Sequence, residues 1–345
     1  MMLNSAIYSS WDNYLSSLPN DKQDIYFTEA YLDLNRNGGI PECYMSKENS
    51  NIWLFPYIKK QINFTGKIYW DFESQYGYGG PITNSNDQVF LQKAQNEFYS
   101  VLKDAGFVAG LVKFHPLFNN HLLLNNCSTL FFNRNTVGVD LIPDIEAIWM
   151  DQIHSKHRNS IRKAEKSGLE YLVDPEFTYY DQFRKLYRAT MERNDADEFY
   201  MFDNDYFEML KEKFKGNSIL AHATLHDQII SSSIFFNSRE YAHYHLSGSN
   251  SEFLSLNPNC FLIYRMIEHF KNLNMKILHL GGGTNQSPDN SLYRFKMRFS
   301  NNRYDFFVGE IVFNKPVYEE ICADWAAINP EKVINNQFKL LKYRF

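Results

Sequence analysis

The sequence predicts a mixed α/β fold built from two units of similar type. The chain has 345 residues, more than one compact core usually holds, so two domains are expected. Each half contains helices, an antiparallel set of strands, a helix and a further strand. Tight hairpins require antiparallel pairs and helical crossovers favour parallel ones, so the sheets should be mixed. We expect domains over 1–142 and 143–325 and a C-terminal segment over 326–345.

Turn residues and changes of hydrophobic period divide the first half of the chain into helices and strands. Thr28 followed by the acid Glu29 suits a first helical turn. A polar turn at 47–51 joins two alternating runs, which predicts a hairpin. The elements expected in this half are helices over 8–17, 28–36 and 86–105, and strands over 41–47, 51–62, 107–114 and 136–142.

The second half begins with a shift of composition, where Pro143-Asp144 starts one long helix that continues to Ser167 and that Gly168 ends. Three β-like runs with short connections follow, which predicts an antiparallel meander. The elements expected after the long helix are strands over 169–173, 219–225, 229–237, 241–247, 277–280 and 306–313, and helices over 177–193, 203–215, 258–273, 290–299 and 316–327.

Composition and charge exclude several classes of protein. Hydrophobic residues make up 44% and charged residues 22%, which is ordinary for a globular protein and excludes bulk disorder. The net charge is −5, which disfavours a globally basic nucleic-acid binder, and no DNA partner is expected. No apolar run approaches the ~20 residues that span a bilayer, so no transmembrane segment is expected.

The cysteines and the N-terminus indicate a cytoplasmic protein. The four cysteines are widely spaced, with no C-x-x-C and no nearby histidine pair, so neither a zinc site nor a disulfide framework is expected. The first residues lack a basic and an apolar region of the secretory type. The cysteines are Cys43, Cys127, Cys260 and Cys322.

A row of cations lies on the long helix. Arg158, Arg162 and Lys166 stack at i, i+4 and i+8, a spacing at which like charges are mildly destabilising. That cost suggests a use, such as gripping phosphate groups or docking on an acidic surface. A solvated basic face explains the same pattern, so both interpretations stay open.

A buried strand runs directly into Gly281-Gly282-Gly283. Such an ending lets backbone N–H groups approach a ligand closely, although a flexible turn is an equal alternative. A short amphipathic helix begins a few residues later and carries Arg294 and Lys296 outside its apolar stripe. These cations can lie near the glycine loop, or they can be solvated.

The strand expected at 241–247 carries two histidines. By strict alternation Tyr241, His243 and His245 share one face, and Tyr244 and Leu246 share the other. Either histidine can serve as a general base, although polar residues on a half-exposed strand are the simpler alternative. No third ligand accompanies the pair, so no metal site is expected.

One glycine-rich loop presents two aromatic side chains, Tyr76 and Tyr78. They offer stacking surfaces to a ligand, or the loop caps a sheet edge. The chain contains no G-x-S-x-G motif and no cysteine in a reactive context. A covalent enzyme intermediate is therefore not expected.

Taken together, these segments resemble the FemABX-type transferases within the wider GNAT acyltransferase superfamily, with a BioF2-like acetyltransferase domain. Four runs carry the resemblance, over roughly residues 25–320, and the last two are the more specific. They are SQYGYGGP (74–81), HRNSIRKAEKSGLEY (157–171), the segment from YHLSGSN to LHLGGG (244–283), and SLYRFKMRFS (291–300).

The resemblance implies two tandem GNAT-like domains, with a C-terminal segment that packs back on the first. It implies N-acyl transfer to an amine of a cell-envelope precursor that carries phosphate groups, without a permanently bound cofactor. The donor is acyl-CoA or aminoacyl-tRNA. The acidic pI and the missing coiled-coil arm favour acyl-CoA, with FemX-type aminoacyl transfer to a peptidoglycan precursor as the alternative. A non-catalytic ligand-binding module is a further alternative.

The resemblance also implies roles for individual residues. Lys296 matches the lysine near the family's transfer site, where it would stabilise charge on the donor or on the oxyanion. Arg193 and Tyr244 match, loosely, positions that contact the phosphates of the acceptor. Arg158 and Arg162 become stronger phosphate candidates for the same reason.

Overall fold

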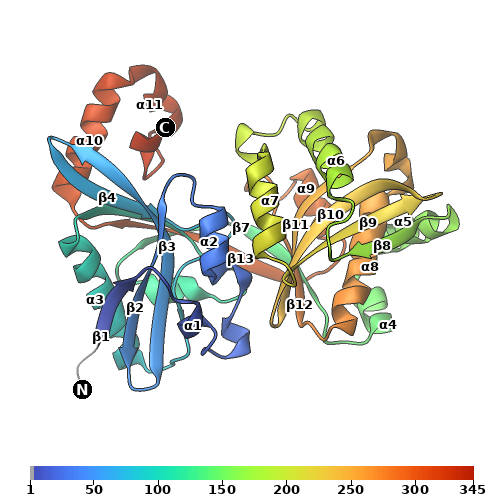
Figure 1. The fold of residues 1–345 in the computed structure, drawn as a ribbon, viewed down its shortest axis with the longest axis horizontal. Helices are drawn as coiled ribbons and strands as arrows, with labels where there is room; N and C mark the ends of the chain where they lie inside the picture. Colours follow the sequence, from blue (N-terminus) through green and yellow to red (C-terminus); the bar gives the residue numbers. More distant parts are fainter. Residues whose placement is uncertain (1–3) are drawn as a thin grey trace. The chain divides into compact units, whose positions relative to one another are not determined.

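The computed structural model describes residues 4–345, with the side chain of Phe199 excepted. The chain forms two compact units (Figure 1). Unit 1 contains the residues up to Asn133 together with Asp305–Phe345, and unit 2 is Arg134–Tyr304. The chain therefore leaves unit 1 once and returns to it once.

The sheet of unit 1 is mixed, as expected. Its strands lie in the order β1-β2-β3-β4-β6-β13, and β5 pairs with β3. All neighbours are antiparallel except β4 and β6, which are parallel. The strands are β1 (Asn4–Tyr8), β2 (Ile40–Glu48), β3 (Asn51–Phe64), β4 (Lys67–Glu73), β5 (Ile82–Thr83), β6 (Phe107–Lys113) and β13 (Arg303–Val312).

Helices cover both faces of this sheet. Side chains alternate between the two faces along β3, so Trp53 and Phe55 both point toward α3 (Gln88–Asp104). Leu54, between them, packs on the opposite face in a cluster that includes residues of α1 (Asp12–Leu15) and α2 (Glu29–Leu34). The strand is consequently buried on both faces.

The C-terminal segment belongs to unit 1. It contains α10 (Lys315–Ile328) and α11 (Pro330–Asn336), drawn in red in Figure 1. Near its end, Arg344 binds the buried carboxylate of Asp71 through two hydrogen bonds of 2.9 and 2.8 Å. Within the described residues, no helix has both the length and the apolar character needed to cross a bilayer.

The sheet of unit 2 follows the same plan. Its strands lie in the order β7-β12-β11-β10-β9-β8. β12 and β11 are parallel and the other neighbours are antiparallel. The strands are β7 (Thr129–Asp140), β8 (Glu170–Asp174), β9 (Ser218–Leu225), β10 (Gln228–Ser238), β11 (Tyr241–Ser249) and β12 (Ile277–Gly281).

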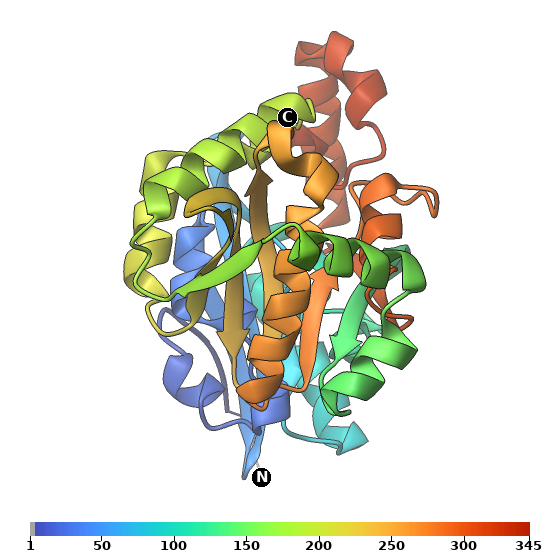
Figure 2. The ribbon, with the colours of Figure 1, turned by 90° about the vertical axis from the view of Figure 1, so that its right-hand side faces the viewer.

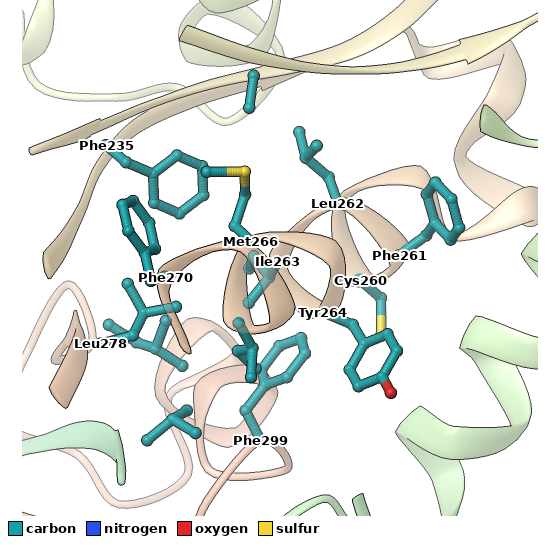
Figure 3. Packing of buried hydrophobic residues seen from close by; sticks show 14 of the residues in the cluster. Phe235, Cys260, Phe261, Leu262, Ile263, Tyr264, Met266, Phe270, Leu278 and Phe299 are labelled. Carbon is teal, nitrogen blue, oxygen red and sulfur yellow. The ribbon is translucent and has the colours of Figure 1, made fainter. Parts of the chain in front are cut away.

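The core of unit 2 forms around α8 (Pro258–Asn272), which is buried on most of its surface. Phe235 and Leu278 from the sheet, together with Phe299, surround it (Figure 3). In Figure 2, α8 (orange) lies in front of the strands of unit 2 and runs roughly along them. Beside it runs α5 (Ser155–Lys166), while α6 (Tyr180–Arg193) and α7 (Asn204–Lys213) cover the other face.

Two strands pair with a sheet other than that of the strand that precedes them in the sequence. β7 follows β6 in sequence but pairs with β12 of unit 2. β13 follows β12 in sequence but pairs with β6 of unit 1. The units therefore divide the chain at 133/134 and 304/305, whereas we expected divisions at 142/143 and 325/326. The expected boundaries left the strand at 136–142 in the first domain and the strand at 306–313 in the second. They differ because the order of elements along the chain does not show which sheet a strand joins.

The hairpin at 40–64 and the meander at 218–249 confirm the expected strand pairs. The single long helix expected from Pro143-Asp144 to Ser167 is wrong. The structure has α4 (Ile145–Ala147), a π-helical turn (Ile148–Gln152) and then α5. His154 is extended, and its Nδ1 accepts a hydrogen bond from the Lys156 N–H, which caps α5 and starts a new helix.

Gly248 lets α6 approach β11 closely. A Cβ at this position would lie 2.3 Å from the backbone carbon of Leu186 and 2.3 Å from the backbone nitrogen of Tyr187. Backbone atoms of a helix cannot move aside as a flexible side chain can, so α6 as a whole would have to shift.

We expect Gly248→Ala to lower the free energy of unfolding by about 1–3 kcal/mol, as overpacking of a core does. Urea denaturation followed by circular dichroism measures this change. Ala189→Val, on the exposed side of the same helix, is the control and should change the stability far less. Equal stability of Gly248→Ala and the wild type would show that α6 does not depend on this contact.

Candidate functional site

Two neighbouring parallel strands separate in the middle of unit 2. The ladder between β11 and β12 covers three residue pairs and ends at His243 and His279, although β11 continues to Ser249. We call the place beyond these two residues, where β11 and β12 no longer pair, the strand opening.

A β-bulge in each strand explains the separation. Along β11, pairing with β10 passes from Tyr244 to Leu246 and leaves His245 as the extra residue. Along β12, pairing with β7 passes from His279 to Gly281 and leaves Leu280 as the extra residue. Because a bulge bends its strand and increases its twist, the two strands turn apart directly after their last shared pair.

The bulge on β11 also changes which side chains share a face. Tyr244 lies opposite Phe235, whereas Leu246 lies opposite Ile234, and consecutive residues of β10 point to opposite faces. The expectation that Tyr244 and Leu246 share a face is therefore wrong. The Tyr244 ring lies on the face covered by α8, 5.4 Å from the ring of Phe235.

The matching strands of unit 1 stay together. β4 and β6 pair up to Glu73 and Leu111, and the N–H of Ser74 donates to the carbonyl of Leu111 at 2.9 Å. A Cβ on Gly110 would lie 2.3 Å from the Phe72 ring, so that ring covers the strand. Of these two parallel pairs, only the one in unit 2 separates.

Lys296 projects into the strand opening. It is the last residue of α9 (Ser291–Lys296), a helix shorter than the expected 290–299. Its Nζ donates to the carbonyl oxygen of Gly282, just beyond β12, at 2.8 Å. The same atom lies 5.9 Å from the centre of the Tyr244 ring on β11. Lys296 thus contacts both strands that form the opening, although only 8% of the residue is exposed.

The surroundings of Lys296 disfavour its charged form. Burial, with the guanidinium of Arg134 as a second cause, lowers the pKa of Lys296 to about 7. Arg134 is held by a hydrogen bond of 2.6 Å to the carbonyl of Gly283. An amine with this pKa exists in both protonation states at neutral pH, so it can accept a proton in one state and stabilise an oxyanion in the other.

A network of hydrogen bonds holds Tyr244 in place. Its hydroxyl donates to Oδ1 of Asn259, in the first turn of α8, at 3.2 Å. Ser247 donates to the same oxygen at 3.3 Å, and Ser233 donates to Ser247 at 2.9 Å. Burial raises the pKa of Tyr244, so its hydroxyl stays protonated. The ring beneath Lys296 is therefore fixed from α8.

The two candidate histidines lie on the other face of β11. His243 directly precedes Tyr244 and therefore points away from it, and its ring lies 5.6 Å from that of His279. His245 shares a hydrogen bond of 2.9 Å with the hydroxyl of Tyr206, on α7. Burial, with His243 as a second cause, lowers the pKa of His245 to about 3, which makes it a weak base. Their catalytic role stays a prediction, and Lys296 is better suited to take a proton.

The glycine loop presents carbonyl groups to the site. We expected N–H groups of Gly281, Gly282 and Gly283 to face a ligand. The carbonyls of Gly282 and Gly283 instead accept hydrogen bonds from Lys296 and Arg134. Gly281 has a φ of +75°, a conformation that favours glycine. The loop therefore positions two cations beside the strand opening.

The remaining candidate cations of unit 2 already have partners. Arg158 donates to the carbonyls of Trp149 and Met150 at 3.1 and 2.7 Å. Arg162 lies over the Trp149 ring, 5.2 Å from its centre. These contacts hold the π-helical turn against α5, which gives both arginines a structural role. Their binding of phosphate stays a prediction.

Arg193 is held by a backbone carbonyl, whereas Arg294 is held by an exposed ion pair. Arg193 donates to the carbonyl of Ser249, at the end of β11, at 3.2 Å, so it lies near one rim of the strand opening. Arg294 is exposed and forms an ion pair of 3.8 Å with Asp289. Arg294 is therefore the more mobile of the two, since an exposed ion pair holds a side chain weakly.

Tyr76 and Tyr78 belong to unit 1, whereas every other candidate residue belongs to unit 2. The Tyr78 ring packs against Tyr26 and His115, with centroids 5.3 and 5.5 Å apart. Gln75 donates to the carbonyl of Tyr78 at 2.6 Å. The loop is thus held internally, and its role toward a ligand stays a prediction.

Two residues of the candidate site have no clear signal in the sequence. Arg134 lies on a strand with no motif around it, and only the pairing of β7 with β12 brings it to the glycine loop. Asn259 follows Pro258 at the start of a helix that was expected. A polar side chain in that first turn is a weak signal, because its partner Tyr244 lies 15 residues earlier.

The low pKa of Lys296 predicts a pH-dependent stability. The unfolded lysine keeps its proton up to its ordinary pKa, while the folded one loses it above about 7. Since the unfolded state then binds more protons, the free energy of unfolding should rise with pH between about 7 and 10, by up to about 1.4 kcal/mol per pH unit. Lys296→Met should lose this rise.

Urea denaturation at a series of pH values tests this prediction. Lys103→Met removes an exposed lysine at the end of α3 and should keep the slope of the wild type. The same slope in Lys296→Met and the wild type would mean that Lys296 titrates as an ordinary lysine.

Comparison with known proteins agrees with this geometry. Residues 154–297 match the family described as an acetyltransferase (GNAT) domain. A UDP-N-acetylmuramoylpentapeptide-lysine N(6)-alanyltransferase of Weissella viridescens is 24% identical over 234 residues, which are 66% of this chain and 66% of that protein. The match thus spans just under two thirds of the relative's length.

Solved structures share the whole architecture. FemX superposes with a TM-score of 0.69 at 14% identity, over 93% of this chain and 100% of FemX. The C-terminal domain of a putative lysylphosphatidylglycerol synthetase from Agrobacterium fabrum gives a TM-score of 0.57 at 14% identity, over 89% of this chain and 91% of that one. The expected α/β fold of two GNAT-like units is confirmed: residues 154–297 match the GNAT acetyltransferase domain, and the chain as a whole has a FemX-like fold.

Proposed function

We propose that this acyltransferase moves an aminoacyl group from aminoacyl-tRNA to an amine of a peptidoglycan peptide precursor. The observation that carries the proposal is the buried Lys296 in the strand opening of unit 2, bound to the Gly282 carbonyl at 2.8 Å. The alanyltransferase of Weissella viridescens, whose name specifies a pentapeptide lysine as acceptor, supports this choice of substrates.

The reaction needs only positioning and one proton transfer. The neutral acceptor amine attacks the ester carbonyl, and a C–N bond forms as negative charge develops on the oxygen. The ammonium form of Lys296 stabilises this oxyanion. As the C–O ester bond breaks, the attacking nitrogen loses a proton and the ribose hydroxyl leaves with one. The pKa of about 7 lets Lys296 relay that proton.

The segment between β11 and α8 favours aminoacyl-tRNA over acyl-CoA as the donor. This choice is the reverse of the one that the acidic pI and the missing coiled-coil arm favoured. The pyrophosphate of CoA needs N–H donors near the opening, yet residues 250–257 contain no glycine. The N–H groups of Glu252, Phe253 and Asn257 are already bonded within the segment. Pro258 then starts α8 without an N–H.

Arg193 supports the handling of a phosphate-bearing acceptor. It lies at the end of β11 through its bonds to the Ser249 carbonyl and the Thr190 hydroxyl, and the guanidinium N–H groups not used in these bonds can donate to a phosphate group. Arg158 and Arg162 contribute less to this proposal, because the π-helical turn already occupies them.

The direct test is a transfer assay with radiolabelled aminoacyl-tRNA as donor and UDP-N-acetylmuramoyl-pentapeptide as acceptor. We expect Lys296→Ala to lower kcat/KM by about 10²–10³-fold, the cost of losing one oxyanion donor. Lys296→Arg keeps a cation but cannot release a proton, so we expect a low activity that no longer varies around pH 7.

Parallel reactions with acetyl-CoA separate the alternatives. Transfer from acetyl-CoA but not from aminoacyl-tRNA would contradict the proposed donor and restore the CoA hypothesis. Saturable binding of the precursor without turnover from either donor, unchanged in Lys296→Ala, would indicate the non-catalytic module. Lys103→Ala is the control for the removal of a lysine and should keep the wild-type rate.

A further inference from the structure

A groove of about 420 Å³ lies between α6 and α7 of unit 2, lined by residues of both helices and of the segment that joins them. Both helices are labelled in Figure 1. The groove shares no lining residue with the strand opening. Its volume lies within the range of small-ligand sites.

One wall of the groove is basic. Arg184, Lys185 and Arg188 line it from α6, and Asp181 supplies the single lining carboxylate. Asp181 forms an ion pair of 3.6 Å with Arg184. Lys185 and Arg188 are exposed and have no carboxylate partner in the described part of the chain. On a chain of net charge −5, this wall is a local excess of positive charge that an anion would balance.

The other wall, which we call the aromatic wall, is lined by Tyr187, Met201, Phe202, Asn204 and Phe207. Tyr187 and Phe207 are buried, so Phe202 and Met201 form most of its accessible surface. The Phe202 ring stacks on that of Tyr206, with centroids 4.1 Å apart and planes 18° apart. The hydroxyl of Tyr187 donates to the carbonyl of Tyr200 at 2.8 Å, which fastens the joining segment to α6. The aromatic wall is therefore held in place beside the cations.

We propose that this groove binds a nucleotide, with the base against Phe202 and Met201 of the aromatic wall and a phosphate on Arg188 and Lys185. Base–aromatic stacking contributes about 1–3 kcal/mol per base, and guanidinium groups bind phosphate bidentately. An acidic peptide would satisfy the cations but leave the aromatic wall without a flat partner. The volume suits a single nucleotide.

The inference deepens the proposed function and rests on it for the source of the nucleotide. In that reaction a nucleoside phosphate comes either from the single-stranded 3′ end of the donor RNA or from the nucleotide of the acceptor precursor. Both sources would present a base and a phosphate group to the groove. Direct binding of small probes distinguishes them without any acyl transfer.

Isothermal titration of the full chain with UMP, UDP and the trinucleotide CCA tests the site. We expect saturable binding at one site per chain that weakens at higher salt. Arg188→Gln and Lys185→Ala should each weaken it about tenfold, and Phe202→Leu should weaken it by removing the ring. Lys103→Ala, in unit 1, is the charge control and should bind as the wild type does.

Each outcome has a defined meaning. Tighter binding of CCA than of UDP assigns the groove to the RNA end, and the reverse assigns it to the acceptor nucleotide. Failure of all three probes to bind, or equal affinity in the wild type and Arg188→Gln, would overturn the proposal. So would a polyglutamate peptide that binds when nucleotides do not. Lys296→Ala should lose transfer but keep nucleotide binding, so the two proposals can fail separately.

Discussion

The separation of β11 from β12 is the constraint on which the rest of unit 2 depends. A bulge at His245 and another at Leu280 turn the two strands apart after His243 and His279. The ladder between β4 and β6 of unit 1 also contains a register shift, yet those strands stay paired up to Glu73 and Leu111. Lys296 lies where β11 and β12 have separated, bound to the Gly282 carbonyl just beyond β12.

The pairing of β7 with β12 completes that site. It brings Arg134 to the glycine loop, where its guanidinium binds the Gly283 carbonyl. β13 pairs with β6. Unit 2 is one continuous segment, whereas unit 1 needs the returning segment to complete its sheet. The bidentate contact of Arg344 with Asp71 fastens the returning segment to unit 1.

Local patterns predicted the hairpins and the helices around 88–104 and 258–272. These patterns depend on turn residues and on hydrophobic period, which short stretches of sequence contain. The choice of Lys296 rests on the family resemblance instead, and its catalytic role stays a prediction. The patterns did not predict the bulges, because a bulge adds one residue without a change of composition. For this reason strict alternation placed Tyr244 and Leu246 on one face. The local patterns also missed Arg134 and the pairings of β7 with β12 and of β13 with β6, because these depend on contacts between distant segments.

The burial of Lys296 has a cost that the surrounding structure must offset. Its pKa of about 7 means that the folded chain holds an ammonium group unfavourably at neutral pH. The carbonyl of Gly282 and the Tyr244 ring stabilise that group in part. A core of α8, Phe235 and Phe299 supplies the stability to tolerate it. If the lysine served packing alone, an apolar side chain of the same length would fill the space without this cost. A lysine buried in so unfavourable a place, next to a second cation, fits the negative charge that would develop there in the proposed acyl transfer.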